Sequence, residues 1–430
     1  MSAAVRRQFA HSVVLRLQQA GFAALWAGGC VRDMLLNLEP DDYDIATSAR
    51  PEEVRTLFGP RKTLAIGESF GVVQVRGSRE EGEVEVATFR QDGGYVDGRR
   101  PVSVSFTDAE QDAQRRDFTI NGMFYDPVQA RVIDYVGGQA DLAQRIVRAI
   151  GDPVARFRED KLRMLRAVRM AARFQAEVEL ATKAAIQQHA PEVIQVSAER
   201  IAQELHKVLT SNWRVAAIRL AGELHLLQAI LPELRLAPEE FADATCCQRS
   251  DHPAGRLLLR LEQLSSFAFP TALACLLLEL PAASPLERAV QAKAIARRLR
   301  LSNEEQFQIA SLIEQQDSLV NWSAQPPHLW KPFLSQPLID ELLALLKVDR
   351  LVRGLGLEEW EAAVERRSST PREILDPPPL LTGQHLIAAG YRPGRDFKAV
   401  LEQVRNAQLD GELQTCEAAM RWAQQYLASR

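Results

Sequence analysis

Strand and helix signals are distributed very unevenly along this chain. Short β-rich segments, separated by turns that contain glycine or proline, occur at residues 22–27, 42–46, 72–75, 84–89, 118–124 and 131–135. Beyond about residue 150, helical periodicity takes over, for example at residues 160–174, 198–209, 257–264, 287–299 and 305–314. The pattern predicts an α+β fold, in which a mixed head is followed by an elongated helical remainder.

Length and composition agree with this organisation. A chain of 430 residues is too long for one compact core, so we expect two or more domains. Residues 1–21 have the spacing of an amphipathic helix that ends at Gly21, which differs from a signal peptide. No apolar stretch of about 18 residues occurs, so we expect no membrane span. Because the net charge is −4, any nucleic-acid contact must come from local basic surfaces.

The cysteines and prolines add two expectations. None of the five cysteines has the spacing of a metal finger, and the adjacent Cys246 and Cys247 are poorly placed for a structural disulfide. We therefore expect reduced thiols and a cytoplasmic location. The three consecutive prolines at residues 377–379 predict a non-helical connector before a C-terminal unit.

Two glycines follow the first predicted strand and begin a helix. Gly28 and Gly29 lie in the segment LWAGGCVRDML, with Arg32 one turn further on. Glycines let the backbone approach a ligand closely, and the exposed N–H groups at a helix start attract anions. Arg32 can add a charge-assisted contact to a phosphate. Taken alone, this pattern is equally typical of an ordinary turn before a helix.

The next predicted strand carries two carboxylates. Asp42 and Asp44 are two residues apart, so they lie on the same face of a strand, with Tyr43 on the other. Glu85, in a later strand, supplies a possible third acidic group. Parallel carboxylates repel each other unless a cation lies between them, and their oxygens suit Mg²⁺. The arrangement predicts two-metal phosphoryl or nucleotidyl transfer rather than a solvated strand end.

Five motifs in a fixed order resemble the class II CCA-adding enzyme and bacterial poly(A) polymerase family. They are GGCVRDMLL, DDYDIATSA, EVATFR, RRDFTING and EDKLRMLR, and together they are far more specific than any one alone. The resemblance is dense over roughly residues 25–210. It implies a polymerase-β-type nucleotidyltransferase head at residues 1–150, a neck at 151–210, a helical body at 211–370 and a helical tail at 371–430.

The resemblance also implies roles for individual residues. Asp42 and Asp44 would be the ligands of Mg²⁺, and Glu85 would be the supporting catalytic carboxylate. The residues expected to contact the phosphates and ribose of the nucleotide are Gly28, Gly29, Arg32, Arg116, Asp117 and Asn121. The family usually has alanine after this asparagine, whereas this chain has Gly122. We expect the difference to affect local packing more than chemistry.

Base selection is expected in the EDKLRMLR segment. Asp160, Arg163, Arg166 and Arg169 recur every third residue on one predicted helix, so neighbours in this series are expected to lie close together. A carboxylate accepts a hydrogen bond from an exocyclic amine, while a guanidinium donates to a ring nitrogen. Asp160 and Arg163 would therefore accept cytosine and adenine but reject uracil and guanine. The alternative is a salt-bridged surface helix, worth about 0.2–0.5 kcal/mol per pair.

Two further segments bear on the RNA. The long Gly-containing segment at residues 91–114 is expected to be a mobile loop. In the family, members that add only CC have a shortened segment here. The intact length in this chain therefore favours addition of the full CCA or of the terminal A. The segment PLLTGQHLIAAGYRPGRDF resembles the family tail that contacts the tRNA elbow. A basic cluster at residues 288–300 is either a phosphate contact or a solvated surface.

The sequence thus predicts a template-independent enzyme that adds or repairs the 3′-terminal CCA of tRNA. It would use CTP and ATP, contact the tRNA 3′ end and elbow, and require neither DNA nor a membrane. The RNA 3′-hydroxyl would attack the α-phosphate and release pyrophosphate. An A-adding enzyme and a poly(A) polymerase remain alternatives, although residues 67–70 lack the basic signature of the latter. An inactive RNA-binding module is disfavoured by the intact Asp42, Asp44 and Glu85.

Overall fold

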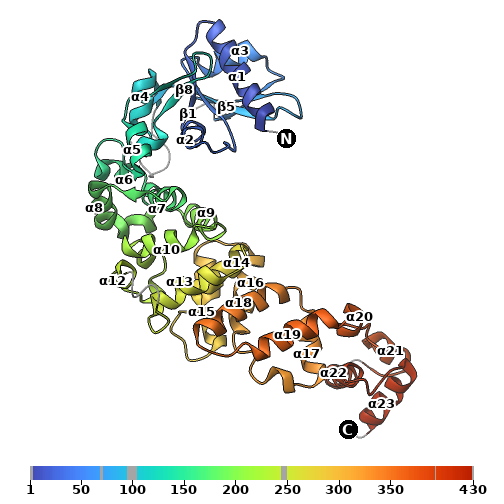
Figure 1. Cartoon of the computed structure of the whole chain (residues 1–430). Helices are drawn as coiled ribbons and strands as arrows, with labels where there is room; N and C mark the ends of the chain where they lie inside the picture. The colour runs from blue at the N-terminus through green and yellow to red at the C-terminus, as the bar shows by residue number, and fades with distance from the viewer. Residues whose placement is uncertain (1–2, 68–70, 94–103, 244–248, 393, 429–430) are drawn as a thin grey trace. The chain divides into compact units, whose positions relative to one another are not determined.

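A computed structural model describes residues 3–67, 71–93, 104–243, 249–392 and 394–428. The chain forms two compact units (Figure 1). The first comprises Met1–Pro232 and Leu236–Ala242, and the second comprises Glu233–Arg235 and Asp243–Arg430. A small sheet lies in the first unit, whereas the second is helical, so the α+β head followed by a helical remainder is confirmed. Within the described ranges, no helix is both long and apolar enough to cross a membrane.

The head is built on a seven-stranded sheet in the order β3-β4-β5-β2-β1-β8-β9. β2 and β5 are parallel, and this pairing places Asp44 directly opposite Glu85. The neighbouring pairs are antiparallel. The strands are β1 (Ala24–Ala27), β2 (Asp44–Thr47), β3 (Thr63–Gly67), β4 (Val72–Arg76), β5 (Glu83–Thr88), β8 (Phe124–Asp126) and β9 (Arg131–Ile133).

The alternation of side chains in β1 separates the two faces of the sheet. Leu25 and Ala27 belong to a buried cluster that also contains Ala46, Phe89 and Phe124. Trp26 points to the other face, where its ring lies 4.8 Å from that of Tyr43. Helix α1 (Ala3–Gln19) packs on this second face through its buried apolar residues, which confirms the predicted N-terminal amphipathic helix.

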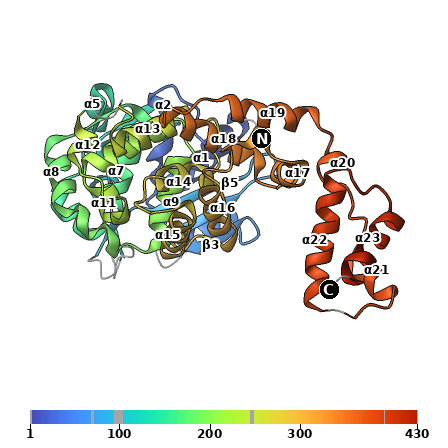
Figure 2. The ribbon, with the colours of Figure 1, turned by 90° about the horizontal axis from the view of Figure 1, so that it is seen from below.

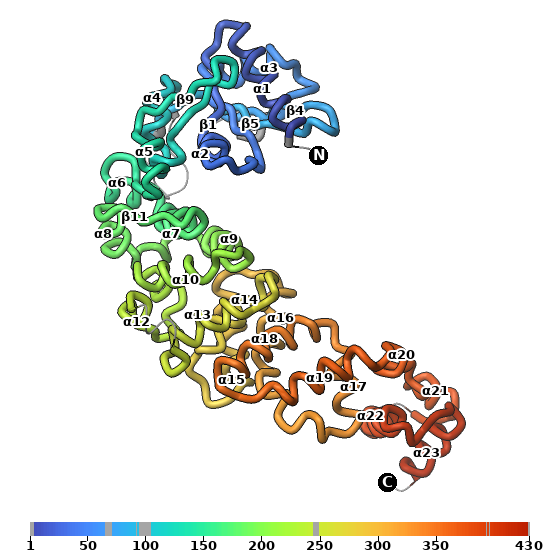
Figure 3. Tube along the Cα trace, in the orientation of Figure 1, coloured from blue at the N-terminus to red at the C-terminus, as the bar shows by residue number. Residues whose placement is uncertain are grey.

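The first unit also contains helices, of which those from α5 onward come after the last strand of the large sheet (Figure 3). They are α2 (Gly29–Leu35), α3 (Pro51–Phe58), α4 (Ala109–Gln114), α5 (Gly138–Gln144), α6 (Pro153–Glu159), α7 (Leu162–Phe174), α8 (Leu180–His189), α9 (Ala198–Leu209), α10 (Arg214–Glu223), α11 (Leu226–Ile230) and α12 (Glu239–Ala242). Helix α7 packs against both α9 and α10, because one of its faces consists of buried Met, Leu, Val and Ala side chains.

The second unit consists of helices. They are α13 (Pro253–Gln263), α14 (Phe269–Leu277), α15 (Pro285–Arg298), α16 (Asn303–Glu314), α17 (Pro327–Ser335), α18 (Ile339–Val352), α19 (Glu358–Ser369), α20 (Arg372–Leu375), α21 (Gly383–Ala388), α22 (Arg395–Leu409) and α23 (Cys416–Ala428). Helices α21 to α23 share a small apolar cluster of their own (Figure 2). The prolines at residues 377–379 form the predicted non-helical connector between α20 and α21.

Two sequence predictions about the head are wrong. Residues 118–124 do not form a strand, because Thr119–Asn121 is a 3₁₀ turn held by local side-chain hydrogen bonds. Asp117 accepts from the backbone N–H of Phe118 at 2.9 Å, and Thr119 donates to Asp141 at 2.7 Å. The expected loop at residues 91–114 is partly ordered as α4 and as a hairpin of β6 (Arg90–Asp92) and β7 (Val104–Phe106).

Some predicted features lie outside the described residues. These are most of the segment proposed to control A addition (residues 94–103), the GESF segment after Gly67, and the pair Cys246 and Cys247. Among the described cysteines, Cys30 and Cys416 are free thiols.

Candidate active site

The Gly28–Gly29 turn is shaped by close neighbours. Gly28 has a φ of 72°, and a Cβ atom there would lie 2.9 Å from Nη1 of Arg116. Any larger residue would therefore be strained and would push this guanidinium away. Helix α2 begins at Gly29, as predicted. The turn thus holds the helix start and Arg116 next to each other, which is a suitable arrangement for a phosphate.

Arg32 is buried inside the head rather than extended into solvent. It is only 4% exposed and donates to Asp33 Oδ1 through Nε at 2.8 Å. Its Nη1 donates to Asn121 Oδ1 at 2.5 Å, and its guanidinium lies 4.5 Å from the centre of the Phe174 ring. These contacts fix Arg32 firmly and connect α2 to α7.

The three predicted carboxylates lie at one end of the sheet. Asp44 begins β2 and faces Glu85 across the parallel pairing, whereas Asp42 precedes the strand. Loss of hydration, followed by repulsion from Asp42 and Glu85, raises the pKa of Asp44 from 3.8 to about 6, although its side chain remains exposed. Tyr43 is buried on the opposite face, so the alternation predicted for this segment is confirmed.

The raised pKa leads to a prediction about stability. Because the neutral form of Asp44 is favoured by folding, its contribution to stability is lost as the pH rises through about 6. In metal-free buffer, Asp44→Asn should therefore raise the free energy of unfolding at pH 8 by about 1 kcal/mol, after allowance for solvent screening at an exposed group. Urea unfolding at pH 4 and pH 8 measures this. A variant as stable as wild type at pH 8 would contradict the prediction.

Asp117 and Asn121 form a buried network with Arg166. Arg166 donates to Asp117 Oδ2 through Nε at 2.8 Å and Nη2 at 2.5 Å, and Asn121 Nδ2 donates to Oδ1 at 3.1 Å. Burial raises the pKa of Asp117, but the Arg166 charge and these hydrogen bonds outweigh it, so this pKa lies well below its usual value. Asp117 is therefore an anion that locks α7 onto the head.

The predicted continuous helix through Asp160 is wrong. Helix α6 ends at Glu159, Asp160 is extended with a φ of −146°, and α7 begins at Leu162. The break is stabilised because Asp160 Oδ1 accepts from the backbone N–H of Leu162 at 3.0 Å. Asp160 therefore lies at a corner, off the α7 face that carries Arg163.

Asp160 and Arg163 each form an ion pair with a different residue, and not with each other. Arg200 of α9 donates to Asp160 Oδ2 at 2.7 Å and to Oδ1 at 3.2 Å, whereas Arg163 pairs with Glu159 at 2.7 Å. The simple surface ion pair between Asp160 and Arg163 is thus not formed. Both side chains instead reach a shared cavity.

This cavity has a volume of about 430 Å³ and lies between the sheet and α7. It is lined by Asp44 and by all ten residues predicted to bind the nucleotide, namely Gly28, Gly29, Arg32, Arg116, Asp117, Asn121, Asp160, Arg163, Arg166 and Arg169. Asp42 and Glu85 flank Asp44 outside the lining. Eight arginines and three aspartates line the cavity, an excess of positive charge that suits a polyanion.

Three arginines of the cavity were not predicted as site residues. Arg115 and Arg173 extend motifs that were already recognised, and Arg173 continues the helical spacing of Arg166 and Arg169. Arg200 is not predicted by any local pattern, because its partner Asp160 lies 40 residues earlier.

The structure explains the departure at Gly122. A Cβ atom there would lie 2.7 Å from Val136 Cγ2 and 2.9 Å from Ile150 Cδ1. Val136 and Ile150 occupy this space, so glycine suits the local packing.

Comparison with known proteins adds independent findings. Residues 24–148 match the model of the poly A polymerase head domain, and residues 177–237 match that of the probable RNA and SrmB-binding site of polymerase A. A CCA-adding enzyme from Geobacillus thermodenitrificans is 41% identical over 220 residues, which cover 51% of this chain and 53% of the relative. The predicted family resemblance is confirmed.

A further relative and a solved structure support the same family resemblance. A CCA-adding enzyme from Leuconostoc citreum is 36% identical over 270 residues, which cover 60% of this chain and 65% of the relative. The chain thus spans between about half and two thirds of the length of these curated relatives. The crystal structure of the Bacillus stearothermophilus CCA-adding enzyme in complex with CTP superposes with a TM-score of 0.75 at 27% identity, covering 99% of this chain and 98% of that one.

Proposed function

We propose that this chain transfers CMP and AMP from CTP and ATP to the 3′ end of tRNA, and so completes or repairs its CCA terminus. The observation that carries the proposal is the single cavity in which Asp44 meets all ten residues predicted to bind the nucleotide. The likeness to CCA-adding enzymes over the head supports the same reaction. The RNA 3′-hydroxyl would attack the α-phosphate, with pyrophosphate as the leaving group.

Mg²⁺ is the proposed cofactor, and Asp42 and Asp44 are its proposed ligands. Within the described ranges, no group of three or more acidic, histidine or cysteine side chains is arranged to hold a metal by itself. Mg²⁺ often takes only one or two protein carboxylates and completes its shell with water and substrate phosphates, so this acidic pair fits it. When bound, the ion would lower the pKa of the attacking hydroxyl and stabilise charge on the phosphate. It would also relieve the repulsion that raises the pKa of Asp44.

The remaining roles belong to the protein's own groups. Arg116 and the helix start at Gly29 are proposed to bind the triphosphate, and the Asp117–Asn121 pair to lie near the ribose. Asp160 and Arg163 are proposed to bind the pairing edge of the base. Because each of these side chains is already held by a protein partner, little ordering is required when the nucleotide binds.

The proposed macromolecular partner is tRNA, with its 3′ end at the cavity and its elbow at the tail. A solved structure of a CCA-adding enzyme from Thermotoga maritima, which shares the fold at 20% identity and a TM-score of 0.64, is complexed with tRNA_CCA. We keep the proposed boundaries of head, neck, body and tail at residues 150, 210 and 370. A cytoplasmic location is proposed from Cys30 and Cys416, which are free thiols among the described residues.

An incorporation assay tests this function. Purified protein is incubated with tRNA that ends at the discriminator base, at C or at CC, together with each labelled NTP singly and all four together. We expect two C residues and then one A to be added, with no product from UTP or GTP. Addition of A only to the CC-ending tRNA would identify an A-adding enzyme. Long A tracts would identify a poly(A) polymerase, and no incorporation at all would overturn the proposal.

A further inference from the structure

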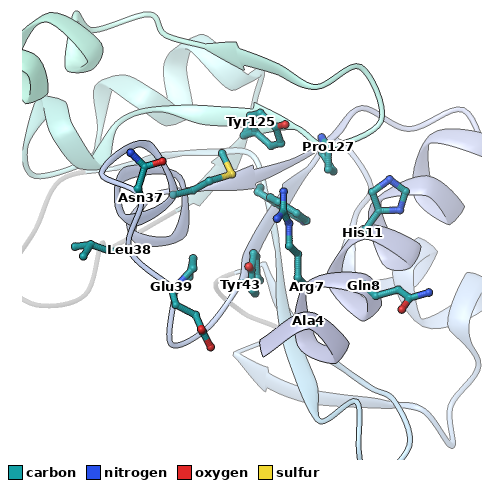
Figure 4. A pocket seen from close by; sticks show the side chains of 13 residues that line it. Ala4, Arg7, Gln8, His11, Asn37, Leu38, Glu39, Tyr43, Tyr125 and Pro127 are labelled. Carbon is teal, nitrogen blue, oxygen red and sulfur yellow. The ribbon is translucent and has the colours of Figure 1, made fainter. Parts of the chain in front are cut away.

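A second and larger cavity lies on the other face of the sheet. Its volume is about 810 Å³, within the range of small-molecule sites. It is bordered by α1, by the segment between α2 and β2, and by β8 (Figure 4). Tyr43 lines this cavity, whereas the adjacent Asp44 lines the catalytic one, so the two cavities lie on opposite sides of the same strand start.

The floor of this cavity is aromatic. Trp26 and Tyr43 lie with ring centres 4.8 Å apart, and Trp26 is stacked with Tyr125 at 5.6 Å. The guanidinium of Arg7 lies 6.0 Å from the centre of the Trp26 ring, at the wall formed by α1. Flat heteroaromatic rings stack on such surfaces, and a neighbouring arginine suits an attached phosphate.

Several polar groups at the cavity are not used by the protein. Among the residues that the structure describes, the side chains of Arg7, His11, Tyr43 and Tyr125 form no hydrogen bond or ion pair. Trp26 is only 2% exposed, yet its Nε1 also has no hydrogen-bond partner. Arg7 is exposed and His11 and Tyr125 are partly exposed, so water can reach them, whereas Trp26 and Tyr43 are buried. Buried polar groups are normally satisfied, so the unpaired Nε1 of Trp26 indicates a site that a ligand can complete.

The lining of the cavity carries one arginine and one carboxylate, and the carboxylate pairs outside the lining. Glu39, the carboxylate that borders it, lies 3.9 Å from Arg6, a neighbour outside the lining. Arg7 is therefore left to meet a negative group of the ligand. A phosphate satisfies Arg7, while a base satisfies the aromatic floor and the hydroxyl groups of Tyr43 and Tyr125.

We propose that this cavity is a second nucleotide-binding site, separate from the catalytic one. Its base would stack against Tyr43 and Tyr125, and its phosphate would meet Arg7. The occupant is either a free nucleotide or an unpaired nucleotide of an RNA strand, since both present the same chemistry. A bound ligand that moves Tyr43 would also move the proposed metal ligands, because Tyr43 lies between Asp42 and Asp44 in the chain.

Binding measurements on the whole chain test this proposal. The variant combines Arg7→Ala at an exposed position with Tyr125→Ala at a partly exposed one, both outside the catalytic cavity. The matched control is Arg16→Ala, the same residue type on the same helix but outside this lining. The two probes are ATP and a short oligoribonucleotide that ends in 3′-deoxycytidine, each measured by equilibrium dialysis. Thermal unfolding of all three proteins verifies that they are folded.

We expect wild type and Arg16→Ala to bind one more equivalent of at least one probe than the double variant, whose affinity for that equivalent falls at least about tenfold. Loss of the ATP equivalent identifies a free nucleotide as the occupant, and loss of the oligoribonucleotide identifies an RNA strand. A folded double variant that binds both probes as wild type does would overturn the proposal.

Discussion

Replacing Asp42 or Asp44 by asparagine is expected to reduce incorporation of CMP and AMP by roughly 1,000-fold or more. Each substitution removes one of the two carboxylates proposed to hold Mg²⁺, and a metal supplies several kcal/mol of transition-state stabilisation. The loss should be equal for every NTP, because neither residue contacts the base in the proposed arrangement. Single-turnover incorporation at saturating tRNA, followed over a Mg²⁺ titration, measures the effect.

The neighbouring acid provides the matched control. Asp41 is exposed and immediately precedes Asp42, and its backbone carbonyl accepts a hydrogen bond from Arg6 at 3.0 Å. Asp41→Asn should therefore keep activity within a few-fold of wild type. Because Asp44→Asn is also expected to gain stability at pH 8, its loss of activity cannot be ascribed to unfolding. Activity within a few-fold of wild type in Asp42→Asn or Asp44→Asn would remove the metal assignment.

The second large effect is expected at Asp160 and concerns the choice of base. Asp160→Ala removes the acceptor for the amino group of cytosine or adenine and leaves Arg200 without this carboxylate, which it now contacts at 2.7 Å. The released guanidinium donates hydrogen bonds, so it would favour the carbonyl oxygens of uracil and guanine. A hydrogen bond to a charged group contributes about 1.5–3 kcal/mol, which corresponds to a tenfold to hundredfold loss of discrimination.

Steady-state incorporation of all four NTPs, each alone, measures this ratio for wild type and variant. Glu199→Ala is the control, because Glu199 is an exposed acid on α9 next to Arg200 and does not line the cavity. It should leave the ratios unchanged. If Asp160→Ala lowers all four rates equally, Asp160 only stabilises the start of α7, and the base is selected elsewhere.

Most of the secondary structure that builds the site follows from local patterns in the sequence. Helix α9 has the bounds predicted from its periodicity, Ala198–Leu209, and α2 begins at the second glycine of the Gly28–Gly29 pair. The opposite orientations of Tyr43 and Asp44 follow from strand alternation. These features are predictable because periodic burial and backbone freedom are encoded within a few consecutive residues.

The sequence, together with its family resemblance, therefore predicted the α+β head, the glycine turn, the acidic pair and most of the residues that line the proposed catalytic cavity. Only the tertiary structure decided that Asp160 lies at a break between α6 and α7 and pairs with Arg200, and that Arg166 is held by Asp117 at 2.5 Å. These pairs join residues 40 and 49 positions apart. A charged residue can pair with any opposite charge that packing brings near, so its partner is fixed by the fold and not by local spacing.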